Sequence, residues 1–181
     1  MTDKEITTIS KFMSLVLRHN PAAAGVTLDG NGWADVSALI TGMNKSRRVS
    51  VTLEDIKEVV VTNDKQRFAF NDDFTKIRAN QGHSVKVDVE LKEAEPPAVL
   101  YHGTVSRFVR GIRNEGLKPQ SRLYVHLSAD RETAAKVGSR RGAAVILVIN
   151  AYKMHEDGYK FYLSENGVWL TDAVPAAYIY D

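Results

Sequence analysis

The first third of the chain carries apolar residues at helical spacing, interrupted by polar turns. Residues 2–5 match a capping box, and apolar residues then recur every three or four positions until Asn20 and Pro21 end the pattern. Asp35 and Thr52 are typical N-cap residues and precede two more stretches of this kind. The pattern predicts three helices. The turn-forming residues 29–32, between the first two, predict a short hairpin.

Residues 66–70 change to the two-residue alternation of a strand. Phe68 and Phe70 share one face of it, and Arg67 is expected opposite them on the same strand. A polar turn at residues 71–73 follows, and residues 77–79 are suited to return as the partner strand. Helices followed by a two-stranded wing are typical of a winged-helix module.

A charged, alternating stretch at residues 86–97 separates this module from the rest of the chain. It ends in Pro96 and Pro97, and consecutive prolines interrupt both helices and sheets. We therefore expect a first domain at residues 1–85, a linker at residues 86–97 and a second domain at residues 98–181.

The second domain mixes strands with helices. A strand is expected at residues 99–101, ending at His102, and the continuous apolar run at residues 143–149 predicts a central buried strand. Asn166 and Gly167 indicate a hairpin. The remaining expected elements are a helix at residues 108–116, a strand at residues 123–127 and a helix at residues 130–137. The chain as a whole is expected to belong to the α+β class.

The composition excludes several classes of protein. The 181 residues include no cysteine, which excludes disulfides and thiolate metal sites and fits a reducing compartment. The N-terminus lacks the pattern of a signal peptide, and no apolar run approaches the roughly 18 residues that span a membrane. We expect a cytoplasmic protein with no membrane partner.

The charge is nearly balanced overall but uneven along the chain. The formal net charge is +2, yet residues 101–150 contain nine Lys and Arg against three Asp and Glu. A basic region on a nearly neutral chain indicates a localised anionic ligand, although an ordinary solvated basic face would produce the same count.

Four of the five histidines lie in short polar clusters: His19, which follows Arg18, and His83, His102 and His126. Two further clusters carry Arg67 and the pair Arg140 and Arg141. Arginine offers a fixed fork of donors for phosphate oxygens, and histidine adds a donor that titrates near neutral pH. Each cluster also has a purely structural interpretation. Arg18 and His19 would suit the negative end of a helix dipole, and Ser128 could cap a helix. No metal-binding, Walker or dinucleotide motif occurs, so we expect no metal ion. Catalysis is then expected to work by positioning the reacting groups and by stabilising the charge of the transition state.

Taken together and in this order, the clusters resemble the RNA 2′-phosphotransferase family. The resemblance covers essentially the whole chain, and its specificity comes from eight motifs at matching spacing. The motifs are residues 17–21, 32–36, 65–68, 79–84, 100–104, 125–128, 137–142 and 166–171.

The resemblance implies an N-terminal winged-helix lobe that holds RNA and a C-terminal ADP-ribosyltransferase-like mixed α/β lobe that holds NAD+. It also implies a role in tRNA splicing and a two-step reaction with NAD+ as co-substrate. An internal RNA 2′-phosphate displaces nicotinamide and forms a 2′-phospho-ADP-ribosylated RNA intermediate. The neighbouring ribose hydroxyl then attacks the phosphorus and releases 2′-OH RNA and ADP-ribose 1″,2″-cyclic phosphate.

The resemblance also implies roles for particular residues. The catalytic tetrad falls on Arg18, His19, Arg67 and Arg140. Contacts with NAD+ fall on His102, Gly103, Thr104, His126, Leu127 and Ser128. The turn that helps to hold the substrate phosphate is Gln81, Gly82, His83 and Ser84. This chain has Arg141 where the family often has histidine, which leaves the division of roles between Arg140 and Arg141 open. Glu165 is interpreted as a surface residue, because phosphate needs no glutamate base.

Two other functions are compatible with parts of the pattern. An ADP-ribosyltransferase that caps 5′-phosphorylated nucleic-acid ends would use the same NAD+ residues and stop after the first step. A non-catalytic winged-helix nucleic-acid binder would explain the first domain, but it would not explain the pattern of His102, His126 and Arg140. The expected partner is a tRNA-like RNA with an internal 2′-phosphate, and the expected assembly is a monomer.

Overall fold

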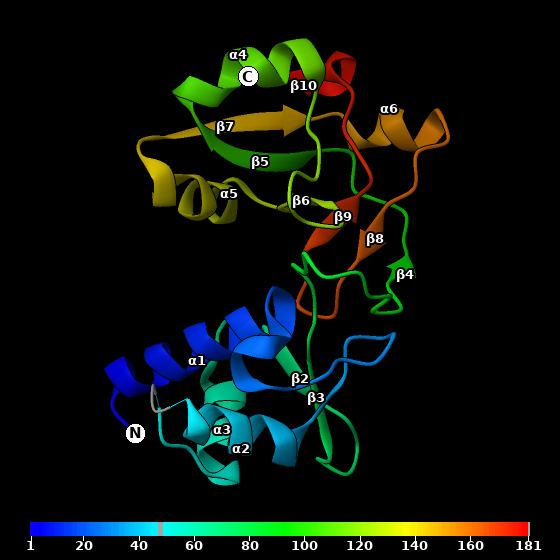
Figure 1. Cartoon of the computed structure of the whole chain (residues 1–181). Helices are drawn as coiled ribbons and strands as arrows, with labels where there is room; N and C mark the ends of the chain where they lie inside the picture. Colours follow the sequence, from blue (N-terminus) through cyan, green and yellow to red (C-terminus); the bar gives the residue numbers. More distant parts are fainter. Residues whose placement is uncertain (47–48, 181) are drawn as a thin grey trace. The chain divides into compact units, whose positions relative to one another are not determined.

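Two separately packed units make up the chain in the computed structural model, which describes residues 1–46 and 49–180. The first unit comprises Met1–Glu90 and the second Leu91–Asp181 (Figure 1). The division between Glu90 and Leu91 lies inside the charged stretch at residues 86–97. Each unit has its own hydrophobic core.

The three helices of the first unit begin at the capping residues that the sequence indicates. Helix α1 (Asp3–Arg18) starts with the reciprocal capping box of Thr2 and Glu5. Helix α2 (Val36–Lys45) is capped by Asp35, and α3 (Leu53–Thr62) by Thr52. The buried faces of these helices converge in one core, whose largest fully buried side chains are Met13, Leu17, Leu39, Met43, Ile56 and Ile77. The three predicted helices are therefore confirmed.

A small antiparallel sheet completes the first unit. Strand β2 (Phe68–Phe70) pairs with β3 (Lys76–Ala79), which confirms the predicted hairpin, and β1 (Ala34–Asp35) joins the other side of β3. Phe68 is buried and Phe70 partly buried, as the alternation predicts. Arg67, however, lies just before β2 and not on the strand. A short 3-10 helix, η1 (Pro21–Ala24), follows α1.

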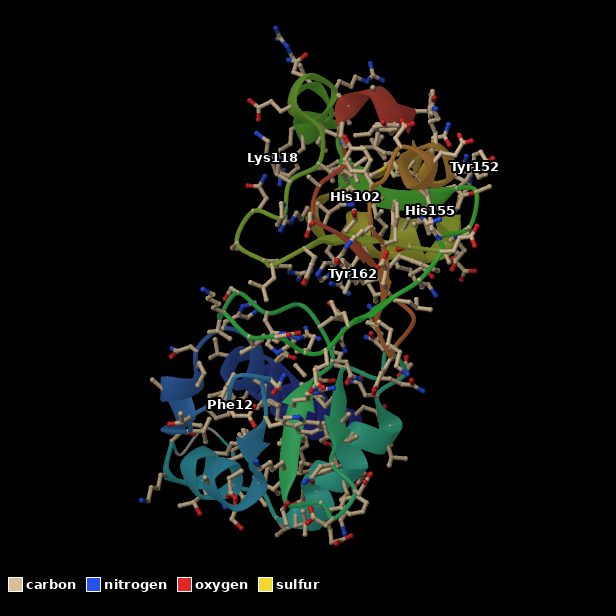
Figure 2. All side chains as sticks on the ribbon, turned by 90° about the vertical axis from the view of Figure 1, so that its right-hand side faces the viewer. Phe12, His102, Lys118, Tyr152, His155 and Tyr162 are labelled. Carbon is tan, nitrogen blue, oxygen red and sulfur yellow. The ribbon has the colours of Figure 1, made fainter. Side chains whose placement is uncertain are left out.

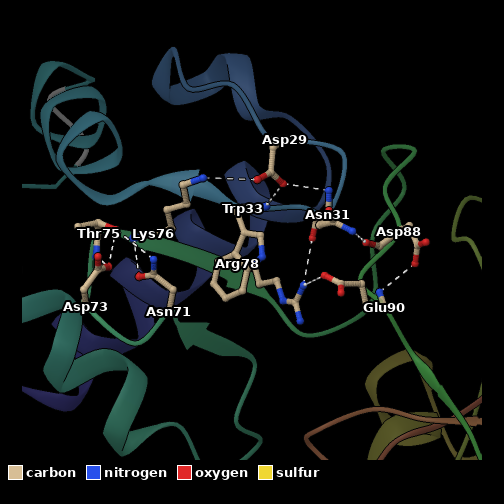
Figure 3. Close-up of polar contacts among 10 residues, drawn as sticks. All are labelled: Asp29, Asn31, Trp33, Asn71, Asp73, Thr75, Lys76, Arg78, Asp88 and Glu90. Carbon is tan, nitrogen blue, oxygen red and sulfur yellow. Dashed lines mark hydrogen bonds and ion pairs between the residues drawn. The ribbon is translucent and has the colours of Figure 1, made fainter.

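The hairpin predicted around residues 29–32 is wrong, although the turn exists. The carboxylate of Asp29 accepts the N–H groups of Asn31 and Trp33 at 2.9 and 3.0 Å (Figure 3). These N–H groups are therefore bonded to a side chain and not to the backbone of a second strand. The chain beyond the turn pairs with β3 instead. The guanidinium of Arg78 on β3 stacks on the Trp33 ring at 4.4 Å, which covers the turn.

The described part of the second unit forms two antiparallel sheets. One has the order β10-β7-β5, and its strands are β5 (Leu100–Val105), β7 (Ala144–Ile149) and β10 (Ile179–Tyr180). The other has the order β4-β8-β9-β6, and its strands are β4 (Lys92–Glu93), β6 (Val125–Leu127), β8 (Tyr162–Leu163) and β9 (Trp169–Thr171). Tyr101 and Ser128 exchange backbone hydrogen bonds of 2.9 and 2.8 Å, which connects the two sheets.

Helices accompany these sheets: α4 (Ser106–Glu115), α5 (Arg131–Gly138), η2 (Ser139–Arg141), α6 (Ala151–Glu156) and η3 (Ala176–Tyr178). The predicted helices at residues 108–116 and 130–137, the central strand β7 and the β8–β9 hairpin are confirmed. Asp130, not Ser128, caps α5, since its carboxylate accepts the Thr133 N–H at 2.7 Å. The predicted strand at residues 99–101 is too short, because β5 stays paired with β7 as far as Val105. The result is a mixed α and β structure, consistent with the α+β class.

Helix α5 lies unusually close to β5 because two glycines meet there. A Cβ added at Gly103 would come within 1.8 Å of the carbonyl oxygen of Ala134, and one at Gly138 within 3.0 Å of the backbone of Thr104. Gly103 therefore sits where no larger residue fits. Its position serves the packing of helix on strand, whatever else it contacts.

We expect Gly103→Ala to destabilise the second unit by about 3 kcal/mol or more, because the new methyl group overlaps a backbone carbonyl that cannot rotate away. Urea unfolding followed by circular dichroism measures this. Gly111→Ala on α4 is the matched control, since nothing lies within 4 Å of its added Cβ. There alanine should add about 0.5–1 kcal/mol of stability. Equal effects at the two positions would contradict the packing described here.

Among the described residues, no helix combines the length and the apolar character needed to cross a membrane.

Candidate functional site

The C-terminal end of α1 is tied to the turn at residues 81–85. The carbonyl oxygen of Arg18 accepts the N–H groups of Ser84 at 2.9 Å and Val85 at 3.2 Å. These bonds satisfy an acceptor that the end of a helix leaves without an intrahelical partner. They also bring two motifs that are far apart in sequence side by side, which places His19 next to Ser84.

The Arg18 side chain packs directly against the backbone of Gly82. The φ of Gly82, +91°, is a conformation that favours glycine, and a Cβ added there would lie 3.4 Å from both Nε and Cζ of Arg18. Only 9% of Arg18 is exposed, although arginine is rarely buried without a reason. The guanidinium is therefore held in one place by the fold.

His19 caps α1 and is exposed, and its ring is held by Ser84. The distance between Nδ1 of His19 and Oγ of Ser84 is 2.8 Å. When the Ser84 hydroxyl donates to Nδ1, the proton of neutral His19 is on Nε2, which makes Nε2 a donor. The pair orients the His19 ring beside a buried guanidinium. Nε2 is a donor in this tautomer and in the protonated ring, which suits a phosphate group.

His83 differs from the other residues of the turn, because it is buried in the first unit with 2% exposure. Burial, and then the charges of Arg18, His19 and Arg78, lower the pKa of His83 from its ordinary value of 6.5 to about 4. His83 is thus neutral at physiological pH. Its Nε2 has no hydrogen-bond partner among the described residues and lies close to Gly32. His83 therefore lies inside the first unit and not at the surface of the turn.

The lowered pKa of His83 predicts an acid-sensitive first unit. Between pH 6.5 and about 4 the unfolded chain binds this proton more readily than the folded unit, so the free energy of unfolding rises with pH in that range. The contribution is fully present above pH 6.5, and about 3 kcal/mol of it is lost as the pH falls to 4. Urea unfolding at several pH values should show this slope, and His83→Gln should reduce it. An unchanged slope in His83→Gln would contradict the prediction.

Arg67 is joined to the same turn through its backbone. Its carbonyl oxygen accepts the N–H of Asn80 at 2.9 Å, and the Asn80 side chain donates to the Gln66 carbonyl at 2.6 Å. Asn80 precedes Gln81, whose Oε1 is buried without a hydrogen-bond partner among the described residues. The first unit therefore connects all of its sequence-predicted site residues through one set of contacts around residues 80–84.

In the second unit, His102 and His126 are linked across β5 and β6. His102 lies among the side chains of the second unit (Figure 2). Its Nδ1 donates to the carbonyl oxygen of His126 at 3.1 Å, because a carbonyl can only accept. Burial lowers the pKa of His102, so the ring is neutral and its Nε2 is an acceptor. An acceptor of this kind suits a hydroxyl or an amide N–H of a ligand.

The other predicted NAD+ contacts differ in how their side chains are placed. Leu127 is 1% exposed in the hydrophobic core, and Thr104 is also buried. With Gly103 packed against α5, these three residues can reach a ligand through their backbone at most. His126 and Ser128 are partly exposed, on the opposite face of the β6 segment from Leu127, as the alternation predicts.

Arg122 is a candidate site residue that the sequence interpretation missed. Its Nη1 donates to Nδ1 of His126 at 3.0 Å. Partial desolvation, then repulsion from Arg140 and Arg141, lowers the pKa of the Arg122 guanidinium. Arg140 and Arg141 are exposed on η2. Three guanidiniums that repel one another around a histidine favour an anionic ligand. The available signal was the spacing of Arg122 four residues before His126.

Among the described residues, no group of three or more His, Asp or Glu side chains is arranged to hold a metal ion.

Comparison with known proteins identifies the family. Residues 4–173 match the model of the family described as RNA 2′-phosphotransferase, Tpt1 / KptA family. A protein of Rhodopirellula baltica is 56% identical over 98% of this chain and 96% of its own length. One of Flavobacterium johnsoniae is 56% identical over 99% of this chain and 98% of its own, and one of Streptomyces coelicolor is 48% identical over 99% and 97%. All three bear the name "Probable RNA 2'-phosphotransferase". The chain therefore belongs to the RNA 2′-phosphotransferase, Tpt1 / KptA family and is an enzyme of the transferase class.

Proposed function

We propose that the chain transfers an internal RNA 2′-phosphate to NAD+ by way of a 2′-phospho-ADP-ribosylated RNA intermediate. Bound NAD+ supplies the ADP-ribosyl group that receives the phosphate, with nicotinamide, 2′-OH RNA and ADP-ribose 1″,2″-cyclic phosphate as products. Membership of the family supports transfer from RNA. The observation that carries the proposal is the buried Arg18 guanidinium, fixed on Gly82 beside the His19–Ser84 pair.

The residues of the first unit are suited to handle the phosphate. Arg18 meets its negative charge without having to be immobilised during the reaction, and Arg67 adds a second cation. His19 donates from Nε2 to a phosphate oxygen or to the departing 2′-oxygen. The Gln81 amide carries N–H donors for a phosphate oxygen, Gly82 supports Arg18, and Ser84 sets the ring orientation of His19. His83 is buried and neutral within the same turn, so we assign it a structural role there and no contact with the phosphate.

The residues of the second unit fit NAD+ in their chemistry. The neutral His102 presents an acceptor for a ribose hydroxyl or the nicotinamide amide, and Ser128 and His126 add polar groups beside it. The guanidiniums of Arg122 and Arg140 suit the phosphoryl group that is transferred. Gly103, Thr104 and Leu127 contribute backbone groups. We assign Arg140 to the catalytic set, as the motifs imply, and add Arg122 because it is oriented by His126.

The organisation that we propose has three parts. Residues 1–85 are a winged-helix lobe for RNA, residues 86–97 connect the lobes, and residues 98–181 are an ADP-ribosyltransferase-like lobe for NAD+. The helices and hairpin of the first unit support the winged helix. We further propose a tRNA-like substrate, a role in tRNA splicing, a cytoplasmic location and a monomer.

The proposed reaction is tested with an oligonucleotide that carries one internal 2′-phosphate. Loss of the 2′-phosphate should require NAD+, should release one nicotinamide for each phosphate removed, and should persist in the presence of EDTA. The purified protein, mixed with the RNA in the presence and absence of NAD+, gives the result by chromatography of both products. Full phosphate removal without NAD+, or complete loss of activity with EDTA, would overturn the proposal.

A further inference from the structure

Helix α4 presents a row of arginines to the solvent. Arg107, Arg110 and Arg113 follow one another at three-residue spacing, and the described residues of the helix include none that is buried. The spacing keeps the three side chains on one side of the helix, with successive positions about 4.5 Å apart along its axis. On the other side, Ile112 packs against the core of the second unit. The helix is thus anchored by its apolar face and leaves its basic face uncovered.

An exposed phenylalanine sits among these charges. Phe108 is 40% exposed, and two guanidiniums lie over its ring, that of Arg107 at 4.9 Å and that of Arg141 at 6.0 Å. An aromatic ring attracts cations to its face, so Phe108 holds both arginines near one another despite their repulsion. It also joins α4 to η2, which carries Arg140 and Arg141.

The stability of the fold does not account for these charges. Within the described part of the chain, no carboxylate lies within ion-pair distance of Arg107, Arg110 or Arg141, whereas Lys118 nearby pairs with Glu115 at 3.6 Å. Arg107 occupies the first turn of α4, where no acidic residue is present and where a cation opposes the helix dipole. Uncompensated cations at an unfavourable place indicate a ligand that supplies the negative charge.

The basic surface continues toward the proposed active site. Arg141 lies over Phe108, and the charges of Arg140 and Arg141 act on Arg122, which contacts His126. A series of guanidiniums therefore leads within the second unit from the NAD+ residues to α4. A single phosphate needs fewer cations than this series offers. A polyanion with regularly spaced charges is the ligand that matches it.

We propose that the α4 surface, defined as Arg107, Phe108, Arg110 and Arg141, binds the RNA strand that flanks the 2′-phosphate. The arginines contact successive backbone phosphates, and Phe108 offers a face on which an unpaired base stacks. The surface reads no sequence, because its contacts are to charge and to a ring face. It makes a long RNA bind more tightly than the few nucleotides around the reacting phosphate. The inference extends the proposed function and rests on RNA as the substrate.

The test measures binding and catalysis separately. Fluorescence anisotropy follows a labelled single-stranded RNA without 2′-phosphate at several salt concentrations. In Arg107→Gln/Arg110→Gln, the slope of log K against log salt should become less steep by about 1.4, the value for two lost contacts to single-stranded RNA. Arg107→Lys/Arg110→Lys should keep the wild-type slope. The matched control is Lys153→Gln/Lys160→Gln, which removes the same charge from exposed positions elsewhere in the second unit.

Catalysis provides the second measurement. The glutamine pair should raise KM several-fold for a long RNA with one 2′-phosphate, leave kcat unchanged, and leave both constants unchanged for a dinucleotide substrate. The proposed role of the α4 surface would be overturned by an unchanged salt slope in Arg107→Gln/Arg110→Gln. It would also be overturned if Lys153→Gln/Lys160→Gln reduced the slope equally. Neither result would affect the proposed reaction. If the wild type removes no 2′-phosphate, the proposed reaction fails, and the binding measurement still decides whether α4 holds RNA.

Discussion

Arg18→Ala is expected to lower the rate of 2′-phosphate removal by about 10²–10³, the usual effect of losing one preorganised charged donor. Arg18 is buried, its guanidinium lies where a Cβ at Gly82 would come within 3.4 Å of it, and its carbonyl oxygen is hydrogen-bonded by Ser84 and Val85. In the proposed reaction the guanidinium therefore meets the phosphate without having to be immobilised first. Arg18→Lys keeps the charge but loses the planar fork, so it should recover only a small part of the rate.

Single-turnover measurements with excess enzyme show whether this loss is in the chemical steps. Lys11→Ala is the matched control, since it removes a cation from an exposed position on the same helix, α1. The control should react at the wild-type rate. The assignment of Arg18 would be wrong if both variants lost activity equally, or if Arg18→Lys were fully active. Circular dichroism spectra of the variants verify that α1 remains folded.

Arg122→Ala is also expected to lower the rate of 2′-phosphate removal by about 10²–10³. This variant should accumulate the 2′-phospho-ADP-ribosylated RNA intermediate. Charge on the phosphoryl oxygens builds chiefly in the second step, so losing a guanidinium there slows that step most. Arg122 and Arg140 are both exposed, but Arg122 is oriented by its 3.0 Å hydrogen bond to His126, whereas Arg140 has no such bond among the described residues. We therefore expect Arg140→Ala to lower the rate less than Arg122→Ala does. His102→Ala should slow both steps, because it weakens NAD+ binding.

Gel analysis of labelled RNA over time separates these outcomes. The intermediate should appear in Arg122→Ala and in His19→Ala, and should be scarce in His102→Ala at any NAD+ concentration. Accumulation in Arg140→Ala with a nearly normal Arg122→Ala would return the role to Arg140, where the sequence motifs place it. If the intermediate accumulated in His102→Ala instead, His102 would act on the phosphoryl group, and its assignment to NAD+ would be wrong.

Local signals in the sequence predict most of the helices. The capping boxes at Thr2 and Thr52 and the cap at Asp35 locate the starts of α1, α3 and α2, because a cap satisfies N–H groups within the same few residues. The β2–β3 and β8–β9 hairpins are also predictable, since a short turn joins each pair.

Long-range pairing is what the sequence does not show. Strand β10 pairs with β7, and β4 with β8, across about 30 and about 70 residues of chain, and no local pattern specifies such partners. The same limit explains the misplaced hairpin at residues 29–32. The Asp29 side chain satisfies that turn locally, and the strand that follows pairs with β3.

The candidate site was predictable in its residue types but not in its arrangement. The motifs point to Arg18, His19 and the turn at residues 81–84, yet only the fold shows that His83 is buried inside the first unit. Likewise, Gly103 and Leu127 serve packing in their observed positions. Arg122 lies just before the strand expected at residues 123–127. Its spacing from His126 is a weak signal, and the structure shows the contact.

The central claim is that the phosphate moves from RNA to the ADP-ribosyl group of NAD+. The measurement that tests it most directly follows radioactive phosphorus placed in the internal 2′-phosphate of an oligonucleotide. After reaction with NAD+, all of the released label should be in ADP-ribose 1″,2″-cyclic phosphate, and the RNA should end with a 2′-OH at that position. Label in inorganic phosphate would show hydrolysis, and label retained on ADP-ribosylated RNA as the final product would show an ADP-ribosyltransferase that stops after the first step. Either result would contradict the account.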